Sequence, residues 1–213
     1  MDAEQLIREA GIVAILRGFD RDASHSITDA VSRGGVRAVE ITANTEGFRT
    51  TLASVAASRE GTATAVGAGT ILDRETARDA IAAGADFLVT PTFDEEVVRV
   101  GNRDGVPVLT GVATPTEALD AYAAGATMCK VFPARSLGPG FVSSLGGPLP
   151  QIPLVPTGGV SRENAAAFFE AGAAALGIGS SIAPNDAVSD GDFAEIERRA
   201  SEFVAIADAH LDG

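Results

Sequence analysis

The chain has few aromatic residues, one cysteine and no tryptophan. Aromatic residues make up 5% of its 213 residues, while glycine occurs 24 times and hydrophobic residues account for 46%. This composition favours an α/β protein with a core of small aliphatic side chains over an all-β one, and it excludes a disordered chain. The single cysteine, Cys129, excludes an internal disulfide bond and gives no sign of an oxidising compartment.

Long hydrophobic segments are also missing. No window approaches the roughly 18 consecutive apolar residues of a membrane helix, and residues 1–5 (MDAEQ) lack the basic start of a signal peptide. The formal net charge of −13 and the pI of about 4.5 describe a surface that repels phosphate backbones. We therefore expect a cytoplasmic protein that binds neither nucleic acid nor a membrane.

Lysine is nearly absent as well. Lysine and arginine together number 16, and Lys130 is the one lysine. An acidic, lysine-poor composition resembles that of proteins from salt-loving organisms, in which carboxylates keep the surface hydrated. In a chain that otherwise uses arginine, a retained lysine points to chemistry that arginine cannot perform.

A loose repeat runs along the chain, in which a helical stretch ends in a small-Gly-small sequence and a short apolar run follows at once. The starts of these runs are spaced by roughly 20 to 27 residues, the length of one βα unit. Residues 114–117 (TPTE) and 92–95 (TFDE) have the form of capping boxes at helix starts. The eight runs are residues 12–16, 37–41, 64–68, 87–89, 106–109, 128–131, 154–155 and 175–178.

Eight alternating units predict a single (β/α)8 barrel domain over residues 1–213, and a doubly wound open sheet is the alternative. Nearly every run ends in a polar residue or glycine, and the active site of such barrels is built from that rim. The alternative is that these polar residues only mark where strands end and loops begin. That alternative explains the threonines but not a Lys or Glu inside a strand. The residues at these ends are Arg17, Glu40, Thr42, Thr70, Thr90, Thr110, Lys130, Thr157, Gly179 and Ser180.

Lys130 lies inside the sixth run, and the two-residue period of a strand puts it on one face with Met128 and Phe132. Both faces of a barrel strand are enclosed, and desolvation favours the neutral, nucleophilic amine. Such an amine is what Schiff-base chemistry on a ketone or keto acid requires. The alternative is a lysine at a strand end whose head reaches solvent.

Two further charged residues lie at strand ends. Glu40 shares the smaller, more polar face of its run with Ala38 and Thr42, and an inward carboxylate is a candidate proton shuttle. Its alternative role is that of a structural partner for Arg17 or Lys130. Arg17 closes the first run, where a guanidinium can hold a carboxylate or phosphate; a surface ion pair is the alternative.

Two glycine-rich turns, residues 156–161 (PTGGVS) and 177–181 (GIGSS), follow the last two runs, where such barrels place their phosphate site. Ordinary tight turns are the alternative. His25 and His210 are the only histidines, and no ligand cluster accompanies them, so we expect no metal. No nucleotide-binding motif is present, and we expect no cofactor.

At these residues the sequence resembles the 2-keto-3-deoxy-6-phosphogluconate (KDPG) aldolase family, which also includes 4-hydroxy-2-oxoglutarate and 6-phosphogalactonate aldolases. The resemblance implies a metal-independent class I aldolase that cleaves KDPG to pyruvate and glyceraldehyde 3-phosphate, usually as a homotrimer. The matching segments are 11–17 (GIVAILR), 34–42 (GGVRAVEIT), 66–70 (VGAGT), 87–91 (FLVTP), 130–134 (KVFPA), 156–160 (PTGGV) and 177–181 (GIGSS).

The same resemblance implies a role for each site residue. Lys130 would form the Schiff base with the C2 carbonyl of a phosphorylated keto-deoxy sugar acid, and Glu40 would act as general acid and base. The expected substrate-binding residues are Arg17, Asn44, Thr70, Phe132 and Thr157, and the expected phosphate-binding residues are Gly158, Gly159, Gly179, Ser180 and Ser181.

Asn44 departs from the family pattern, because many members carry an arginine there that contacts the substrate carboxylate. Some phosphogalactonate aldolases carry Asn at this place together with the strand-1 arginine, so a galactonate or dual-epimer enzyme is an alternative. Two other classes compete: a phosphate-binding barrel isomerase and a non-catalytic sugar-phosphate binder. Neither needs Lys130.

The acidic, lysine-poor composition predicts dependence on high salt, because added counterions relieve repulsion among surface carboxylates. We expect the thermal unfolding midpoint and the turnover rate to be higher in molar potassium chloride than in dilute buffer. Full stability and activity in dilute buffer would count against this interpretation of the surface.

Overall fold

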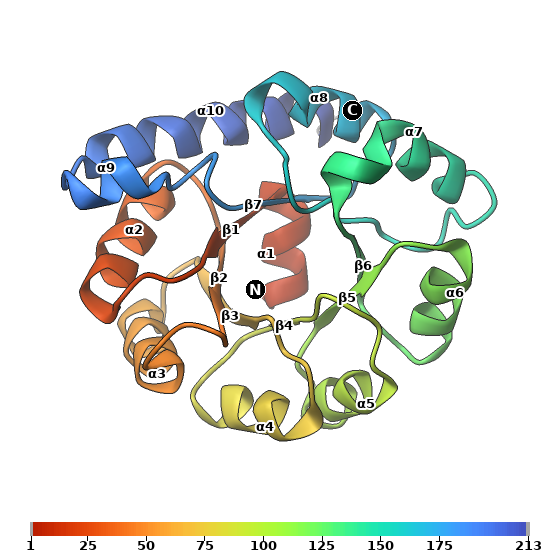
Figure 1. The fold of residues 1–213 in the computed structure, drawn as a ribbon, viewed down its shortest axis with the longest axis horizontal. Coiled ribbons are helices and arrows are strands. Elements are labelled where there is room, and N and C mark those ends of the chain that lie inside the picture. The colour runs from red at the N-terminus through yellow and green to blue at the C-terminus, as the bar shows by residue number, and fades with distance from the viewer. Residues whose placement is uncertain (1, 212–213) are drawn as a thin grey trace.

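The computed structural model describes residues 2–211, which alternate between strands and helices arranged as a ring (Figure 1). None of the helices in this part of the chain is long and apolar enough to cross a membrane. The elements are α1 (Ala3–Ala10), β1 (Ile12–Leu16), α2 (Arg21–Arg33), β2 (Ala38–Thr42), α3 (Phe48–Arg59), β3 (Ala65–Gly69), α4 (Arg74–Ala82), β4 (Leu88–Val89), α5 (Glu95–Asp104), β5 (Val108–Val112), α6 (Pro115–Ala123), β6 (Met128–Val131), α7 (Ala134–Gly146), α8 (Arg162–Glu170), β7 (Leu176–Ile178), α9 (Asn185–Ser189) and α10 (Phe193–Leu211).

The strands form a parallel sheet of seven, in the order β6-β5-β4-β3-β2-β1-β7. Residues 154–157 lie between its two edges and join them through the isolated bridges Cys129–Leu154 and Thr157–Gly177. The structure therefore confirms a parallel α/β barrel rather than an open doubly wound sheet.

The prediction of eight regular strands is wrong at the run of residues 154–155. Pro153 and Pro156 flank it, and neither has an N–H group to donate to a neighbouring strand. Their carbonyls still accept hydrogen bonds, Pro153 from Cys129 N–H (2.8 Å) and Pro156 from Gly177 N–H (2.9 Å). The segment pairs with β6 through four backbone hydrogen bonds but with residues 174–177 through only two, so the ladder is incomplete on the side of β7.

One of the two predicted helix starts is also misplaced. Thr114 caps α6, with its hydroxyl accepting from Glu117 N–H (3.2 Å) and with Pro115 as the first helical residue, as predicted. In contrast, α5 is capped by Asp94 and not by Thr92. The backbone at Thr92 is held elsewhere, because its carbonyl accepts a hydrogen bond from the Thr90 hydroxyl (2.6 Å) at the end of β4.

The strands separate two apolar layers. Outward-facing side chains pack beneath the ring of helices, and inward-facing ones fill the barrel with Val13, Ala38, Phe87, Leu109 and Met128 among them. Helix α1 lies across the amino end of the barrel, at the centre of the ring in Figure 1, and its Leu6 and Ile7 belong to this inner cluster. The amino end is therefore plugged by side chains from the start of the chain.

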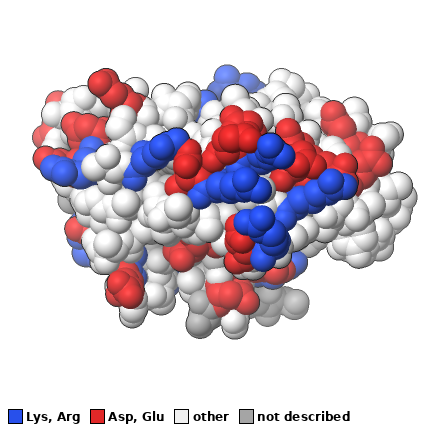
Figure 2. Space-filling view, turned by 90° about the horizontal axis from the view of Figure 1, so that it is seen from below, with Lys and Arg blue, Asp and Glu red and all other residues white. Residues whose placement is uncertain are grey.

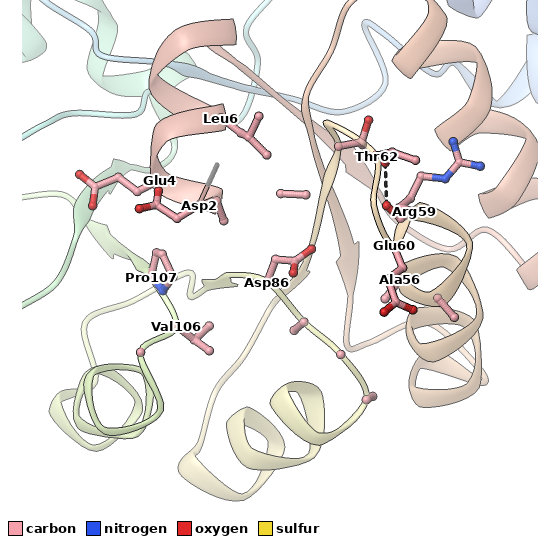
Figure 3. Close-up of a pocket in the computed structure, with 18 of the residues that line it drawn as sticks. Asp2, Glu4, Leu6, Ala56, Arg59, Glu60, Thr62, Asp86, Val106 and Pro107 are labelled. Carbon is pink, nitrogen blue, oxygen red and sulfur yellow. Dashed lines mark hydrogen bonds between the residues drawn. The ribbon is translucent and has the colours of Figure 1, made fainter.

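A cavity of about 930 Å³ lies beside this plug. It is lined by α1 and by the loops that lead into the strands, with Asp2, Glu4, Thr62, Asp86 and Pro107 around it (Figure 3). It contains no lysine, and its walls are mostly small residues.

The inner face of β3 carries only small residues, Ala65, Gly67 and Gly69. A Cβ atom at Gly67 would lie 2.5 Å from the ring of Phe87, and one at Gly69 would collide with the carboxylate of Glu40. Strand β3 thus leaves room inside the barrel for an aromatic ring and for a buried carboxylate.

Gly67→Ala should lower the free energy of unfolding by about 1–3 kcal/mol, the usual range for overpacking a core. Phe87→Leu removes the ring that the new methyl group meets, so Gly67→Ala should cost less in that background. Urea unfolding of the two single variants and the double variant measures the coupling. Strictly additive effects would show that the ring does not cause the cost.

Candidate active site

A second cavity, of about 390 Å³, lies at the opposite end of the barrel, where the strands end. Its walls come from the loop after β1, from β6 and the start of α7, and from the two glycine-rich turns. None of the acidic residues within residues 2–211 lines it. The lining residues are Ile15, Arg17, Phe19, Lys130, Phe132, Arg135, Thr157, Gly158, Gly159, Val160, Ser161, Gly179, Ser180, Ser181, Ala183 and Asn185.

Lys130 lies near the end of β6 and faces this cavity, with 4% of its surface exposed. Its Nζ lies 5.4 Å from the centroid of the Phe132 ring. The neighbouring Cys129 belongs to the outer apolar layer, and burial raises the pKa of its thiol to about 12. The cavity therefore receives the amine of Lys130, while the thiol beside it in sequence faces the helices.

Glu40 lies on β2 with 1% of its surface exposed. Its Oε1 has no hydrogen-bond partner, and the register pairs Glu40 with Ile15 of β1. Burial raises the pKa of this carboxyl group, and the positive charges of Lys130 and Arg17 oppose that rise. A carboxyl group held in this way, within the field of a buried amine, is suited to giving and taking a proton.

The two glycine-rich turns meet at one wall of the cavity. Gly158 and Gly159 have φ angles of 89° and 86°, which lie in the left-handed region that favours glycine. The Ser181 hydroxyl donates to the Val160 carbonyl (2.7 Å) and so ties the second turn to the first. Helix α8 begins immediately after the first turn, with Ser161 as its N-cap. Backbone N–H groups and a helix start together favour an anion here.

Asn44 and Thr70 do not line the cavity, although both were expected to bind substrate. Asn44 is exposed in the loop after β2. Thr70 directly follows β3 and is the one non-glycine residue of the described chain with a positive φ, at 57°. Thr45 joins the loops after β1 and β2, because its hydroxyl accepts from Gly18 N–H (3.0 Å) and contacts the Thr42 hydroxyl (3.1 Å).

Sequence reasoning missed several residues that the structure brings to the cavity, notably Arg135, Ser161 and Asn185. Arg135 follows the 130–134 segment directly, so a cation next to that motif was the available signal. Ser161 ends the first glycine-rich turn. Asn185 begins α9, and nothing in its sequence surroundings marks it. Within residues 2–211 there is no group of three or more His, Cys, Asp or Glu residues that could hold a metal ion.

Comparison with known proteins gives consistent matches along the chain. The family model described as KDPG and KHG aldolase matches residues 3–199. The 2-dehydro-3-deoxy-phosphogluconate aldolase of Pseudomonas aeruginosa is 37% identical over 201 residues, which cover 93% of this chain and 90% of that protein. The 2-dehydro-3-deoxy-6-phosphogalactonate aldolase of Escherichia coli K12 is 36% identical over 172 residues, covering 80% and 83%.

A solved structure described as "Native KDPGal structure" superposes with a TM-score of 0.87 at 31% identity, over 95% of this chain and 96% of that one. Sequence and backbone therefore agree on the same group of proteins.

The buried carboxyl of Glu40 predicts a pH dependence of stability. Its pKa is raised in the folded protein, so the folded state holds a proton that the unfolded state releases once the pH exceeds the ordinary value of 4.5. The free energy of unfolding should therefore fall as pH rises through the interval between the two pKa values. Glu40→Gln removes this loss, so its stability relative to the unaltered protein should increase from pH 4 to pH 8.

Urea unfolding across this pH range measures the difference. The control is Glu46→Gln, which changes an exposed glutamate in the next loop. A Glu40→Gln difference that stays constant with pH, or that decreases, would contradict the assignment.

Proposed function

This chain belongs to the KDPG and KHG aldolase family, and we propose that it cleaves 2-keto-3-deoxy-6-phosphogluconate to pyruvate and glyceraldehyde 3-phosphate through an imine on Lys130. It is a lyase, as its named relatives are. One observation carries the assignment to this cavity: the one lysine of the chain is buried at the rim of the barrel, in the field of the buried Glu40.

In the proposed reaction the amine of Lys130 adds to the C2 carbonyl and gives a carbinolamine. Glu40 donates a proton to the departing hydroxyl, so that water leaves and a protonated imine remains. The Glu40 carboxylate then accepts the proton of the C4 hydroxyl. The C3–C4 bond breaks, its electrons pass into the imine to form an enamine, and the aldehyde leaves. Protonation at C3 and hydrolysis release pyruvate and restore the amine.

The protonated imine is the electron sink of this reaction, so the proposal includes neither a metal nor a cofactor. Arg17 and Thr70 would hold the keto-acid end, with Phe132 and Thr157 against the chain of the substrate. The residues proposed for the phosphate are Gly158, Gly159, Gly179, Ser180 and Ser181. Asn44 would act at the edge of the site, because it is exposed outside the cavity lining.

The C4 epimer of the substrate defines a second candidate function. A named galactonate-type aldolase is 36% identical to this chain, close to the 37% of a gluconate-type one. The PTGGV segment favours the gluconate epimer, while Asn44 combined with Arg17 favours the galactonate epimer. Pyruvate release from each epimer, followed with lactate dehydrogenase, decides between them.

We propose in addition that the protein works as a cytoplasmic homotrimer.

Treatment with pyruvate and borohydride should leave a reduced pyruvate adduct on Lys130, because reduction fixes the imine covalently. Intact mass and peptide mapping measure it, and with one lysine in the chain the main competing amine is the N-terminus. Lys130→Arg should abolish both the adduct and turnover while the fold stays intact, since a guanidinium does not form the imine.

A Lys130→Arg variant that keeps substantial turnover would overturn the mechanism. A folded, unaltered protein without any adduct would favour the isomerase or the non-catalytic binding barrel instead. Circular dichroism of both proteins establishes that they are folded.

A further inference from the structure

The active-site cavity collects positive charge in an acidic protein. The chain has a net charge of −13, yet Arg17, Lys130 and Arg135 line this cavity together, and none of the carboxylates that the structure describes lines it. Elsewhere arginines and acidic residues are interleaved on the surface (Figure 2), as in the pair between Arg99 and Glu95 (2.7 Å) on α5. The cavity therefore gathers positive charge without the acidic partners that most arginines of this chain have.

Arg135 forms no ion pair with any residue that the structure describes. Among residues 2–211, most arginines form an ion pair, while Arg17, Arg37, Arg78 and Arg135 form none. The side chain of Arg135 is exposed, and the hydrogen bonds that arginine side chains donate within residues 2–211 all come from other arginines. Its five N–H donors are free to bind a ligand.

The position of Arg135 is fixed by the first glycine-rich turn. Its backbone N–H donates to the Gly158 carbonyl (2.8 Å). A Cβ atom at Gly159 would lie 2.6 Å from the Cβ and 2.7 Å from the Nε of Arg135, so the arginine side chain lies directly against that glycine. The guanidinium thus borders the same turn whose N–H groups favour an anion.

Resting on the proposed function, we propose that Arg135 is a specificity-determining residue that selects substrates with a phosphate at the end remote from the keto group. A guanidinium matches the oxygens of a phosphate dianion with two parallel hydrogen bonds, and a neutral hydroxyl offers it no such partner. Lys130 fixes the C2 end of the substrate, and Arg135 reads the charge at the other end. No motif of the sequence assigned this residue.

Arg135→Gln should lower kcat/KM for 2-keto-3-deoxy-6-phosphogluconate by about 10- to 100-fold, mainly through KM, the range expected for a lost charged hydrogen bond. Cleavage of the unphosphorylated 2-keto-3-deoxygluconate should change little, so the preference for phosphate should fall by the same factor. Arg135→Lys keeps the positive charge but loses the two parallel N–H donors. Its kcat/KM for the phosphorylated substrate should lie between those of Arg135→Gln and the unaltered enzyme. Inorganic phosphate should inhibit Arg135→Gln more weakly than the unaltered enzyme.

Arg162→Gln is the matched control. Arg162 begins α8 beside the same turn, but it pairs with Glu202 (2.5 Å) and does not line the cavity. Arg162→Gln removes one positive charge from the same region as Arg135→Gln does. A general electrostatic effect on kcat/KM would therefore appear in both variants at equal ionic strength. Borohydride trapping with pyruvate, which carries no phosphate, should succeed equally in all of these proteins.

The outcomes separate the two proposals. If the unaltered enzyme forms the pyruvate adduct but Arg135→Gln matches Arg162→Gln on both substrates, or loses the same factor on both, the role of Arg135 is overturned and the aldolase function stands. If the unaltered enzyme forms no adduct, the proposed function fails, and the selection of its substrate by Arg135 fails with it.

Discussion

Two ionisable side chains buried inside the barrel, the amine of Lys130 and the carboxyl group of Glu40, impose the central constraint on this structure. An amine and a carboxylate removed from water each carry a desolvation cost, and here neither is offset by an ion pair or by a full set of hydrogen bonds. The fold accommodates them locally: β3 presents only Ala and Gly to the carboxylate of Glu40, and the Phe132 ring lies beside Lys130. The apolar filling below and the α1 plug provide the stability that such a site requires.

Much of the architecture is readable from the sequence because each βα unit carries its own signals. Apolar runs, helix caps such as Thr114 and polar strand ends are local features, and they predict the parallel α/β barrel and the rim that holds Lys130 and Glu40. The errors arise where a distant contact overrides the local pattern. Prolines on both sides of residues 154–155 prevent a full strand, and a hydrogen bond from Thr90 holds Thr92 so that Asp94 caps α5.

The site itself was predictable only in part, since proximity in space depends on loops. Lys130, Arg17 and both glycine-rich turns surround one cavity, but Glu40, Asn44 and Thr70 lie outside its lining. Arg135 belongs to no motif. Its role in binding can be inferred only from the structure, in which its side chain lies against Gly159 and none of the described carboxylates lines the same cavity. The net charge of a sequence does not show which charged side chains form ion pairs. Ligand binding depends on the side chains that remain unpaired, and the structure is needed to identify them.

The closure of the barrel through residues 154–157 has a mechanical consequence. This short segment is joined to residues 174–177 by two backbone hydrogen bonds, from Ala174 N–H to the Leu154 carbonyl (2.8 Å) and from Gly177 N–H to the Pro156 carbonyl (2.9 Å), so few bonds hold this seam of the ring. The two glycine-rich turns leave the barrel on either side of it. An anion bound to both turns would bridge this seam. Binding of the anion would therefore stabilise the closed barrel, and opening of the seam would weaken binding of the anion.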